Sequence, residues 1–274
     1  MSFRNTQICA ISALPKGIKL IVDIAYTQHL GRNTGQQDAL WNGKEVFQRR
    51  NVPADQIAGG DDDGPVIVAV ADGVASSPVP QKASKFVLET LSREIAGGAS
   101  FDPRTIRRVH GRLCDVLAKG DTFGSSTTLA AVACQIDRCT VISVGDSRGY
   151  RITADGIWKQ LTRDHTILNA MIDRGEADSE TEYATIYNML DSCLVADDEE
   201  TEFPVHREES PFLIGDSILL CTDGVHDTLG DAKMQQLTDQ SLDSCAQIGV
   251  WRKAVLAAGA PDNFSMILLR RIAS

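Results

Sequence analysis

Five aspartates border apolar, strand-like stretches of this chain, and together they could perform metal-ion chemistry. Asp72 follows "VIVAVA", Asp146 follows "VISVG" and Asp223 follows "ILLCT". The other two, Asp38 and Asp262, come shortly before strand-like stretches. Carboxylates gathered at strand ends are hard oxygen ligands, which suit Mg²⁺ or Mn²⁺. Any one of them alone could equally begin a turn, as Asp-Gly commonly does, so only their recurrence favours a metal site.

Glycines follow two of these acids directly, in the pairs Asp72-Gly73 and Asp223-Gly224. A residue without a Cβ lets the backbone approach an ion or its waters closely. Two divalent ions roughly 3.5–4 Å apart can share one water, lower its pKa from about 15.7 towards about 7, and hold a phosphoryl group for in-line attack. The pattern therefore indicates hydrolysis of a phosphoryl group.

The elements that must position these acids follow from hydrophobic periodicity. Apolar or alternating runs predict strands, the Asn42-Gly43 pair favours a type I′ hairpin turn, and helical spacing predicts helices. Four consecutive short strands separated by turns read as an antiparallel meander. Strands that neighbour in sequence, interrupted by helix pairs, favour an α+β fold. The expected strands cover 19–28, 66–71, 125–136, 139–145, 148–153, 156–161, 216–224 and 263–272, and the expected helices include 79–98, 103–120 and 166–175.

The amino-acid composition limits the classes of protein to which this chain could belong. The 274 residues carry 27 Lys and Arg against 37 Asp and Glu, a net charge of −10, which argues against a nucleic-acid surface. Seven cysteines without a CxxC spacing are typical of buried, reduced thiols. The first 20 residues lack the long apolar stretch typical of a signal peptide, no 18-residue apolar run occurs, and no linker or repeat divides the sequence. We expect one domain over 1–274, located in the cytoplasm, with no membrane partner.

Seven motifs then occur in the order found in one enzyme family. They are "QQDA", "VAVADGV", "GSSTTLAAV", "VGDSRGYRI", "LTRDHT", "LLCTDGV" and "PDNFSMILL". Over nearly the whole chain the sequence resembles the metal-dependent Ser/Thr protein phosphatases of the PP2C (PPM) type, in their bacterial form. The resemblance implies a central antiparallel β-sandwich flanked by helix pairs, in α-β-β-α layers, with a two-metal site at one edge of the sheets.

The resemblance also implies a role for each acid. Asp72 would bridge two Mn²⁺ or Mg²⁺ ions, the Gly73 carbonyl would bind the second, and Asp223 and Asp262 would hold the first. Asp38 matches the acid of the first motif, and Asp146 matches an acid that helps bind a third, weaker ion. A water bridging the metals would attack phosphoserine or phosphothreonine directly, without a phosphoenzyme. Asn263 is expected to support the water network.

Three departures from the family pattern concern the substrate cleft. The family's phosphate-binding Arg stands five residues before the first acid, whereas Arg32 stands six before Asp38. Gln37 stands where many family members have a Glu. Val74-Ala75-Ser76 stand where the family commonly has a His or Met and a pair of glycines. We keep Arg32 as the expected phosphate ligand. A solvent water or a water on a third metal ion, rather than a His, would then protonate the leaving group.

Other interpretations are weaker. We expect the Asp61–Asp63 run to be a solvated loop, His165 to have a structural role and Cys221 to pack in the core. Ser147 in "GDSR" does not fit a GDSL esterase, because no Asp-x-x-His follows late in the sequence. Residues 164–183 are expected to form a mobile flap that tunes substrate choice. The main alternative to an active enzyme is a pseudo-phosphatase that binds a phosphoprotein. The expected partners are phosphorylated proteins and a cognate Ser/Thr kinase, and the expected state is a monomer.

Overall fold

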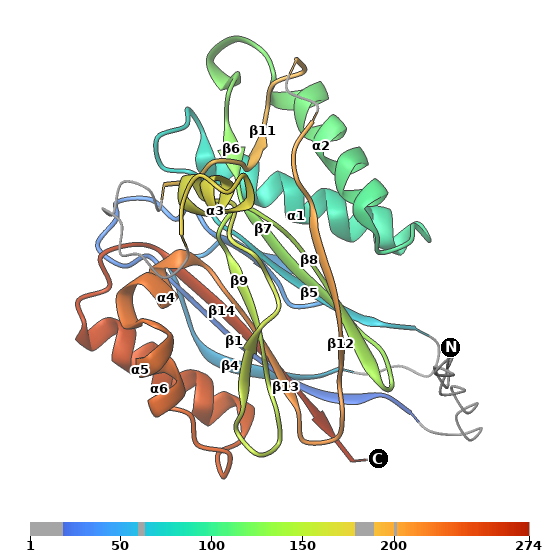
Figure 1. Ribbon diagram of the computed structural model, residues 1–274, viewed down its shortest axis with the longest axis vertical. Coiled ribbons are helices and arrows are strands. Elements are labelled where there is room, and N and C mark those ends of the chain that lie inside the picture. The colour runs from blue at the N-terminus through green and yellow to red at the C-terminus, as the bar shows by residue number, and fades with distance from the viewer. Residues whose placement is uncertain (1–18, 60–63, 179–188, 200–201, 274) are drawn as a thin grey trace, which may run out of the picture.

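Two antiparallel sheets pack face to face, and helices cover both outer faces (Figure 1). The computed structural model describes residues 19–59, 64–178, 189–199 and 202–273. The predicted α-β-β-α sandwich is confirmed. The first sheet runs in the order β10 (Trp158–Gln160), β9 (Arg148–Ile152), β13 (Ser217–Cys221), β14 (Phe264–Ile272), β1 (Ile21–His29) and β4 (Asn51–Gly59). The second runs in the order β12 (His206–Pro211), β8 (Arg138–Val144), β7 (Leu129–Cys134), β5 (Val66–Ala71), β2 (Ala39–Trp41) and β3 (Val46–Phe47).

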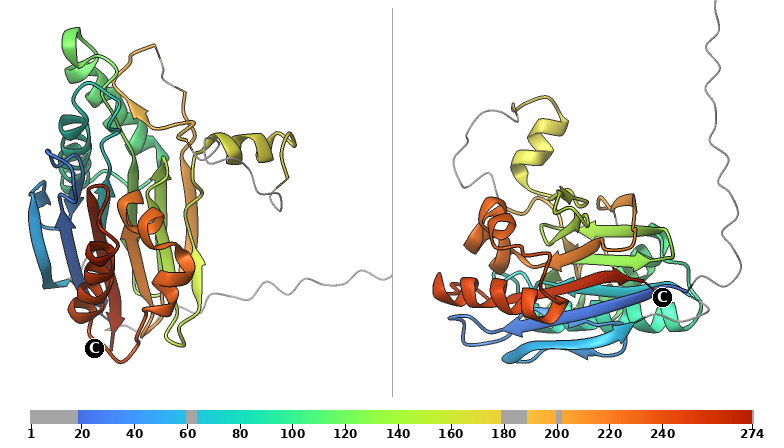
Figure 2. Two further views of the ribbon diagram at one scale, coloured as in Figure 1. Left: turned by 90° about the vertical axis from the view of Figure 1, so that its left-hand side faces the viewer. Right: turned by 90° about the horizontal axis from the view of Figure 1, so that it is seen from below.

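Helices form the outer layers. On the second sheet lie α1 (Pro80–Ala96) and α2 (Pro103–Leu117), and on the first lie α4 (Asp223–Leu229), α5 (Asp231–Gln236) and α6 (Ser244–Ala257). Helix α3 (Ile167–Asp173) projects away from the sandwich (Figure 2). A 3-10 turn (Gly120–Thr122) and the short pair β6 (Ser126–Thr127) and β11 (Leu194–Val195) complete the elements. No helix in the described ranges combines the length and apolarity needed to cross a bilayer.

Three hydrophobic clusters hold the layers together. One lies between α1–α2 and the second sheet, one between the sheets, and one between the first sheet and α4–α6. Strand β5 shows why the apolar runs fold this way: its alternate residues, such as Val68 and Ala69, enter the first two clusters from opposite faces. Cys221 is buried in the third cluster, as predicted. Among the described residues, Cys114, Cys134, Cys139, Cys221 and Cys245 carry free thiols.

Two local predictions are wrong. The expected meander over 125–161 is divided between the sheets: β7 and β8 pair in the second, whereas β9 and β10 belong to the first. The chain therefore crosses the sandwich between Val144 and Arg148. The β2–β3 hairpin has a four-residue connection rather than a type I′ turn. Asn42 Oδ1 accepts the N–H groups of Lys44 and Glu45 at 3.0 and 2.9 Å, an Asx turn that stabilises this longer loop.

Candidate functional site

The two sheets bring their acid-bearing ends to one place. Asp38 precedes β2 and Asp72 follows β5 in the second sheet, whereas Asp262 precedes β14 in the first. Asp223 is the first residue of α4, directly after β13, and Asp146 lies where the chain crosses between the sheets. Asp72 senses the charges of Asp223, Asp38 and Asp146, and Asp223 senses that of Asp262. The structure therefore gathers all five predicted acids into one cluster.

Asp72 is the central member of the cluster. Burial raises its pKa well above the ordinary value, and the negative charges of Asp223 and Asp38 raise it further. Its carboxyl shares side-chain hydrogen bonds with Asp38 and Asp223, lowering the pKa of each. Burial nevertheless raises the pKa of Asp223 overall. Burial and the neighbouring charges therefore favour the neutral form of Asp72 when no cation balances the acids.

Asp38 is fully buried, and two hydroxyl groups orient it. Its Oδ2 accepts hydrogen bonds from Thr222 Oγ1 at 2.9 Å and Ser265 Oγ at 2.8 Å. Burial raises its pKa to about 7, although the Ser265 hydrogen bond opposes the shift. These donors come from the segments that carry Asp223 and Asp262, so Asp38 connects the two sheets at the site.

The crossing loop that carries Asp146 is held from several sides. His226 Nε2 lies 3.1 Å from the backbone oxygen of Asp146. His165 Nδ1 accepts the N–H of Gly145 at 3.1 Å, which supports the structural interpretation of this histidine. Burial raises the pKa of Asp146 to about 7, and the charge of Asp223 adds to the shift. Asp146 is therefore anchored through its backbone, while its carboxyl lies near enough to Asp223 to sense its charge.

The loop before β14 is tied to the loop before β2. Asn263 is buried, its Oδ1 accepts the N–H of Gln37 at 2.7 Å, and its Nδ2 donates to Leu30 O at 2.6 Å. Asp262 Oδ1 in turn accepts from Asn33 Nδ2 at 2.5 Å. The hydrogen bonds of Asn263 therefore join the two loops, and its role in a water network stays a prediction.

Glycines allow these loops to approach one another. A Cβ on Gly224 would lie 1.9 Å from Asn263 O, and one on Gly73 would lie 2.6 Å from the Pro80 carbonyl group. Both distances are far shorter than a carbon contact permits. Because these glycines have no side chain, the backbone segments beside the acids can pack closely against one another. This role adds to the close approach to ions that the sequence predicted.

The donor set fits divalent cations. Three carboxylate oxygens of the cluster, Asp38 Oδ1, Asp146 Oδ1 and Asp223 Oδ1, are buried without a hydrogen-bond partner. A buried acceptor left unpaired costs free energy, and hard cations bind such oxygens. As the side chains stand, no group of three His, Cys, Asp or Glu residues in the described ranges already encloses an ion position. The Asp72–Asp223 hydrogen bond would have to break before both carboxylates bound metal.

Two predicted features lie outside the cluster. Arg32 is exposed, and its guanidinium group lies against Gly259, where an added Cβ would be 2.6 Å from Nη2. Its backbone N–H donates to Ala260 O at 3.0 Å, which places it on the rim of the loop leading to Asp262. The predicted solvated loop at 61–63 lies outside the described residues.

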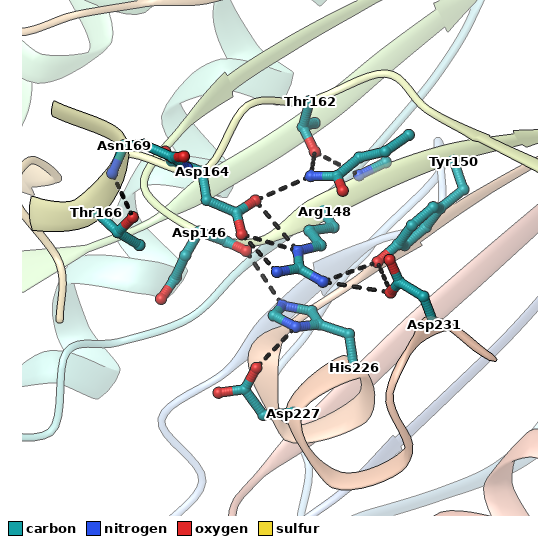
Figure 3. A network of polar contacts seen from close by, with 12 residues as sticks. Asp146, Arg148, Tyr150, Thr162, Asp164, Thr166, Asn169, His226, Asp227 and Asp231 are labelled. Atoms are coloured by element: carbon teal, nitrogen blue, oxygen red, sulfur yellow. Dashed lines mark hydrogen bonds and ion pairs between the residues drawn. The ribbon is translucent and has the colours of Figure 1, made fainter. Parts of the chain in front are cut away.

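A polar network beside the acids was not predicted (Figure 3). Arg148 pairs with Asp164 at 2.6 Å and with Asp231 at 3.3 Å, while His226 Nδ1 lies 3.0 Å from Asp227 Oδ1. Arg148 belongs to the motif "VGDSRGYRI" and Asp164 to "LTRDHT", so the signal was present but neither residue stood at a strand-end acid position. Only the folded chain shows that they meet.

Comparisons with known proteins agree with this geometry. Residues 42–258 match the family model for Protein phosphatase 2C. The serine/threonine phosphatase stp of Listeria innocua is 26% identical over 215 residues, which cover 75% of this chain and 84% of that protein. Stp1 from Staphylococcus aureus shares the fold with a TM-score of 0.72 at 18% identity, over 92% of this chain and 95% of that one. The catalytic domain of PstP, in complex with 2 manganese ions, matches with a TM-score of 0.69 at 21% identity, over 92% of this chain and 99% of that one.

Proposed function

The chain belongs to the protein phosphatase 2C family, and from that premise we propose that it is a metal-dependent protein serine/threonine phosphatase. The observation that carries the proposal is the set of unpartnered, buried carboxylate oxygens on Asp38, Asp146 and Asp223. Such a site is costly without cations and favourable with them. The PstP structure with manganese supports Mn²⁺ as the metal, with Mg²⁺ as the alternative.

We assign the metal-holding role to side chains and one carbonyl of the cluster. They are Asp72, Gly73 through its carbonyl, Asp223, Asp262 and, for a weaker third ion, Asp146. When bound, two divalent cations would activate a water for direct attack and neutralise charge on the phosphoryl group. Asp38, buried beneath Asp72 and Asp223, would keep those acids oriented. Arg32 on the rim would contact the substrate phosphate.

The proton for the leaving group would come from solvent. His226 is buried, and its two ring nitrogens already face the Asp146 carbonyl oxygen and Asp227. The Nδ1 of His165 likewise accepts a hydrogen bond from the N–H of Gly145. Both ring nitrogens of His226 and the Nδ1 of His165 are engaged in these contacts, and no His stands at position 74.

The pseudo-phosphatase alternative is not favoured. A binding module has no need to keep several acids unpaired in a buried cluster, because each costs stability. We further propose that the chain forms a single domain, acts as a monomer in the cytoplasm, and opposes a Ser/Thr kinase on its phosphoprotein substrates. The free thiols of Cys114, Cys134, Cys139, Cys221 and Cys245 support a reducing compartment.

Metal removal tests the activity. The purified protein is assayed on a phosphothreonine peptide and on p-nitrophenyl phosphate, first with EDTA and then with added Mn²⁺ or Mg²⁺. We expect no turnover with EDTA and recovery with either ion. An acid quench during turnover of labelled substrate should leave no phosphorylated protein. Full turnover without metal, or a trapped phosphoenzyme, would contradict the proposal.

A further inference from the structure

Arg148 is the centre of a charged network at the start of β9 (Figure 3). Its Nε lies 3.1 and 2.9 Å from the two carboxylate oxygens of Asp164, and its Nη2 lies 2.6 Å from Oδ2. Its Nη1 reaches Tyr150 Oη and Asp231 Oδ1, each at 3.3 Å. The side chains of Arg148 and Asp164 are 22% and 10% exposed, whereas that of Asp231 is 42% exposed. The Asp164 fork is therefore the stronger, better shielded contact.

Asp164 is the anchor from which α3 begins. Its backbone oxygen accepts Asn169 Nδ2 at 2.8 Å, and its Oδ1 also accepts Gln160 Nε2 at 3.0 Å. Thr166 caps the helix by accepting the N–H of Asn169 at 3.3 Å, and Ile167 N donates to Met189 O at 3.0 Å. Polar contacts therefore join the start of α3 to the body.

Beyond these contacts, helix α3 is held by Arg163, whose Nη2 lies 2.6 Å from Asp173 Oδ1 and 3.4 Å from Asn169 O. It contains no buried residue, and it projects from the sandwich (Figure 2). None of its residues belongs to the three hydrophobic clusters. A helix of seven residues gains little stability by itself, so its placement depends on its attachments.

A cavity of about 260 Å³ lies between the start of α3 and α4, directly beside the acid cluster. Arg148 and Asp164 contribute to its wall, together with Asp146, Thr166, Asn169 and His226. A phosphopeptide whose phosphate reached the acids would extend beyond them along this wall. A small aryl phosphate would not extend so far.

We propose that Arg148 is a positioning residue for phosphopeptide binding. Through Asp164 it holds the first turn of α3 at the wall of this cavity, so that the helix meets the peptide in a fixed place. The inference rests on the proposed function, whose site it deepens. Arginine suits the task because its planar fork binds both oxygens of one carboxylate, which lysine cannot do.

Four variants test whether the Arg148–Asp164 ion pair, called the tether below, holds the start of α3 in place. Arg148→Met and Asp164→Asn, singly and combined, break the fork, and Arg148→Lys keeps the charge without it. Asp231→Asn is the matched control, because it changes the exposed contact of the same guanidinium and the hydrogen bond from Tyr150 Oη but leaves the Asp164 fork intact. Each protein is assayed at saturating Mn²⁺ for kcat and KM on both substrates, and hydrogen exchange is measured over 166–173 without substrate.

We expect KM for the phosphothreonine peptide to rise roughly tenfold in Arg148→Met and Asp164→Asn, with kcat on p-nitrophenyl phosphate within about twofold of wild type. The double variant should be no worse than either single one, because both remove one interaction. Exchange over 166–173 should quicken, and Arg148→Lys should fall between wild type and Arg148→Met. Asp231→Asn should resemble wild type.

Equal losses on both substrates, or unchanged exchange in α3, would overturn the inference and leave Arg148 a general structural residue. Additive losses in the double variant would overturn it as well. If the wild-type protein itself turned over neither substrate, the proposed function would fail. The exchange comparison among variants would still report on the tether, so the two failures are distinguishable.

Discussion

The side-chain oxygens of Thr128 and Ser147 lie 2.7 Å apart, and this contact joins two acid-bearing segments of the site. Thr128 Oγ1 also accepts the backbone N–H of Asp72 at 3.0 Å, and the N–H of Thr128 donates to Asp72 O at 2.8 Å. Ser147 directly follows Asp146 and is buried. The end of β5 and the loop that crosses between the sheets are thus linked through one hydroxyl group.

Replacing this hydroxyl should weaken the link. Thr128→Val keeps the shape but leaves the Asp72 N–H and the Ser147 hydroxyl without their partner. We expect the free energy of unfolding to fall by about 1–3 kcal/mol, together with a measurable loss of activity. Chemical denaturation and the peptide assay test this. Thr128→Ser is the control and should retain both properties; wild-type behaviour of Thr128→Val would show that the link does not matter.

Asp72→Asn should separate activity from stability. The substitution removes one charge from the position proposed to bridge both cations, so both should bind less well. Near neutral pH we expect a rate loss of roughly 10²–10³ at saturating Mn²⁺. The metal-free protein should be as stable as wild type or more so, because a crowded acid becomes neutral.

Asp121→Asn is the matched control for that variant, since Asp121 is an exposed acid away from the cluster. Its rate and melting temperature should both stay at the wild-type values. Should Asp72→Asn keep more than about a tenth of the wild-type rate, the bridging assignment would be wrong and Asp72 would be a turn residue only.

The stability of the metal-free protein should depend on pH through the acid cluster. The pKa values of Asp38 and Asp146 are raised from 3.8 to about 7 in the folded chain. Between these values the folded state binds more protons than the unfolded state, so these groups favour folding at low pH. Their contribution is lost as the pH rises through the folded pKa of about 7.

Melting curves in EDTA at several pH values measure this effect. The melting temperature of wild type should fall from pH 5.5 to pH 8 more steeply than that of Asp72→Asn, in which one acid of the cluster cannot ionise. With saturating Mn²⁺, the melting temperature of wild type should no longer fall more steeply with pH than that of metal-free Asp72→Asn. Parallel slopes for the two metal-free proteins would show that the cluster does not titrate as proposed.

Gly224→Ala should damage the site through the backbone. The new methyl carbon would lie 1.9 Å from Asn263 O, so either α4 or the loop before β14 must move. We expect unfolding free energy to fall by at least about 1–3 kcal/mol and Mn²⁺ affinity to drop. Gly111→Ala in α2 is the control, since an added Cβ there meets nothing within 4 Å and alanine favours a helix. Equal stability of the two variants would contradict this account.

Apolar central strands could be predicted from the sequence, whereas two of the edge strands could not. β5, β7, β13 and β14 are apolar runs because neighbours cover both of their faces. β4 and β12, which lie at sheet edges, include Pro53 and the polar stretch "HREES", so they resemble loops. The crossing after Val144 was missed because local alternation does not say which sheet a strand joins.

The acids of the site were predictable because each stands at the end of an apolar run. His226, Arg148 and Asp164 were not, because their importance arises from partners distant in the sequence. Arg148 and Asp164 are 16 residues apart, and His226 meets a carbonyl 80 residues away. The loop-joining hydrogen bonds of Asn263 were missed for the same reason: their partners lie 226 and 233 residues away.

The absence of buried side chains from α3 bears on how this protein can change over evolutionary time. Substitutions in the helix do not disturb the packing of the sandwich, so selection can alter it without the losses that core changes bring. The acids beneath it have no such freedom. Substrate range and chemistry can therefore diverge at different rates, and a chimera carrying the α3 segment of a relative should keep its melting temperature while acquiring the peptide preference of the donor.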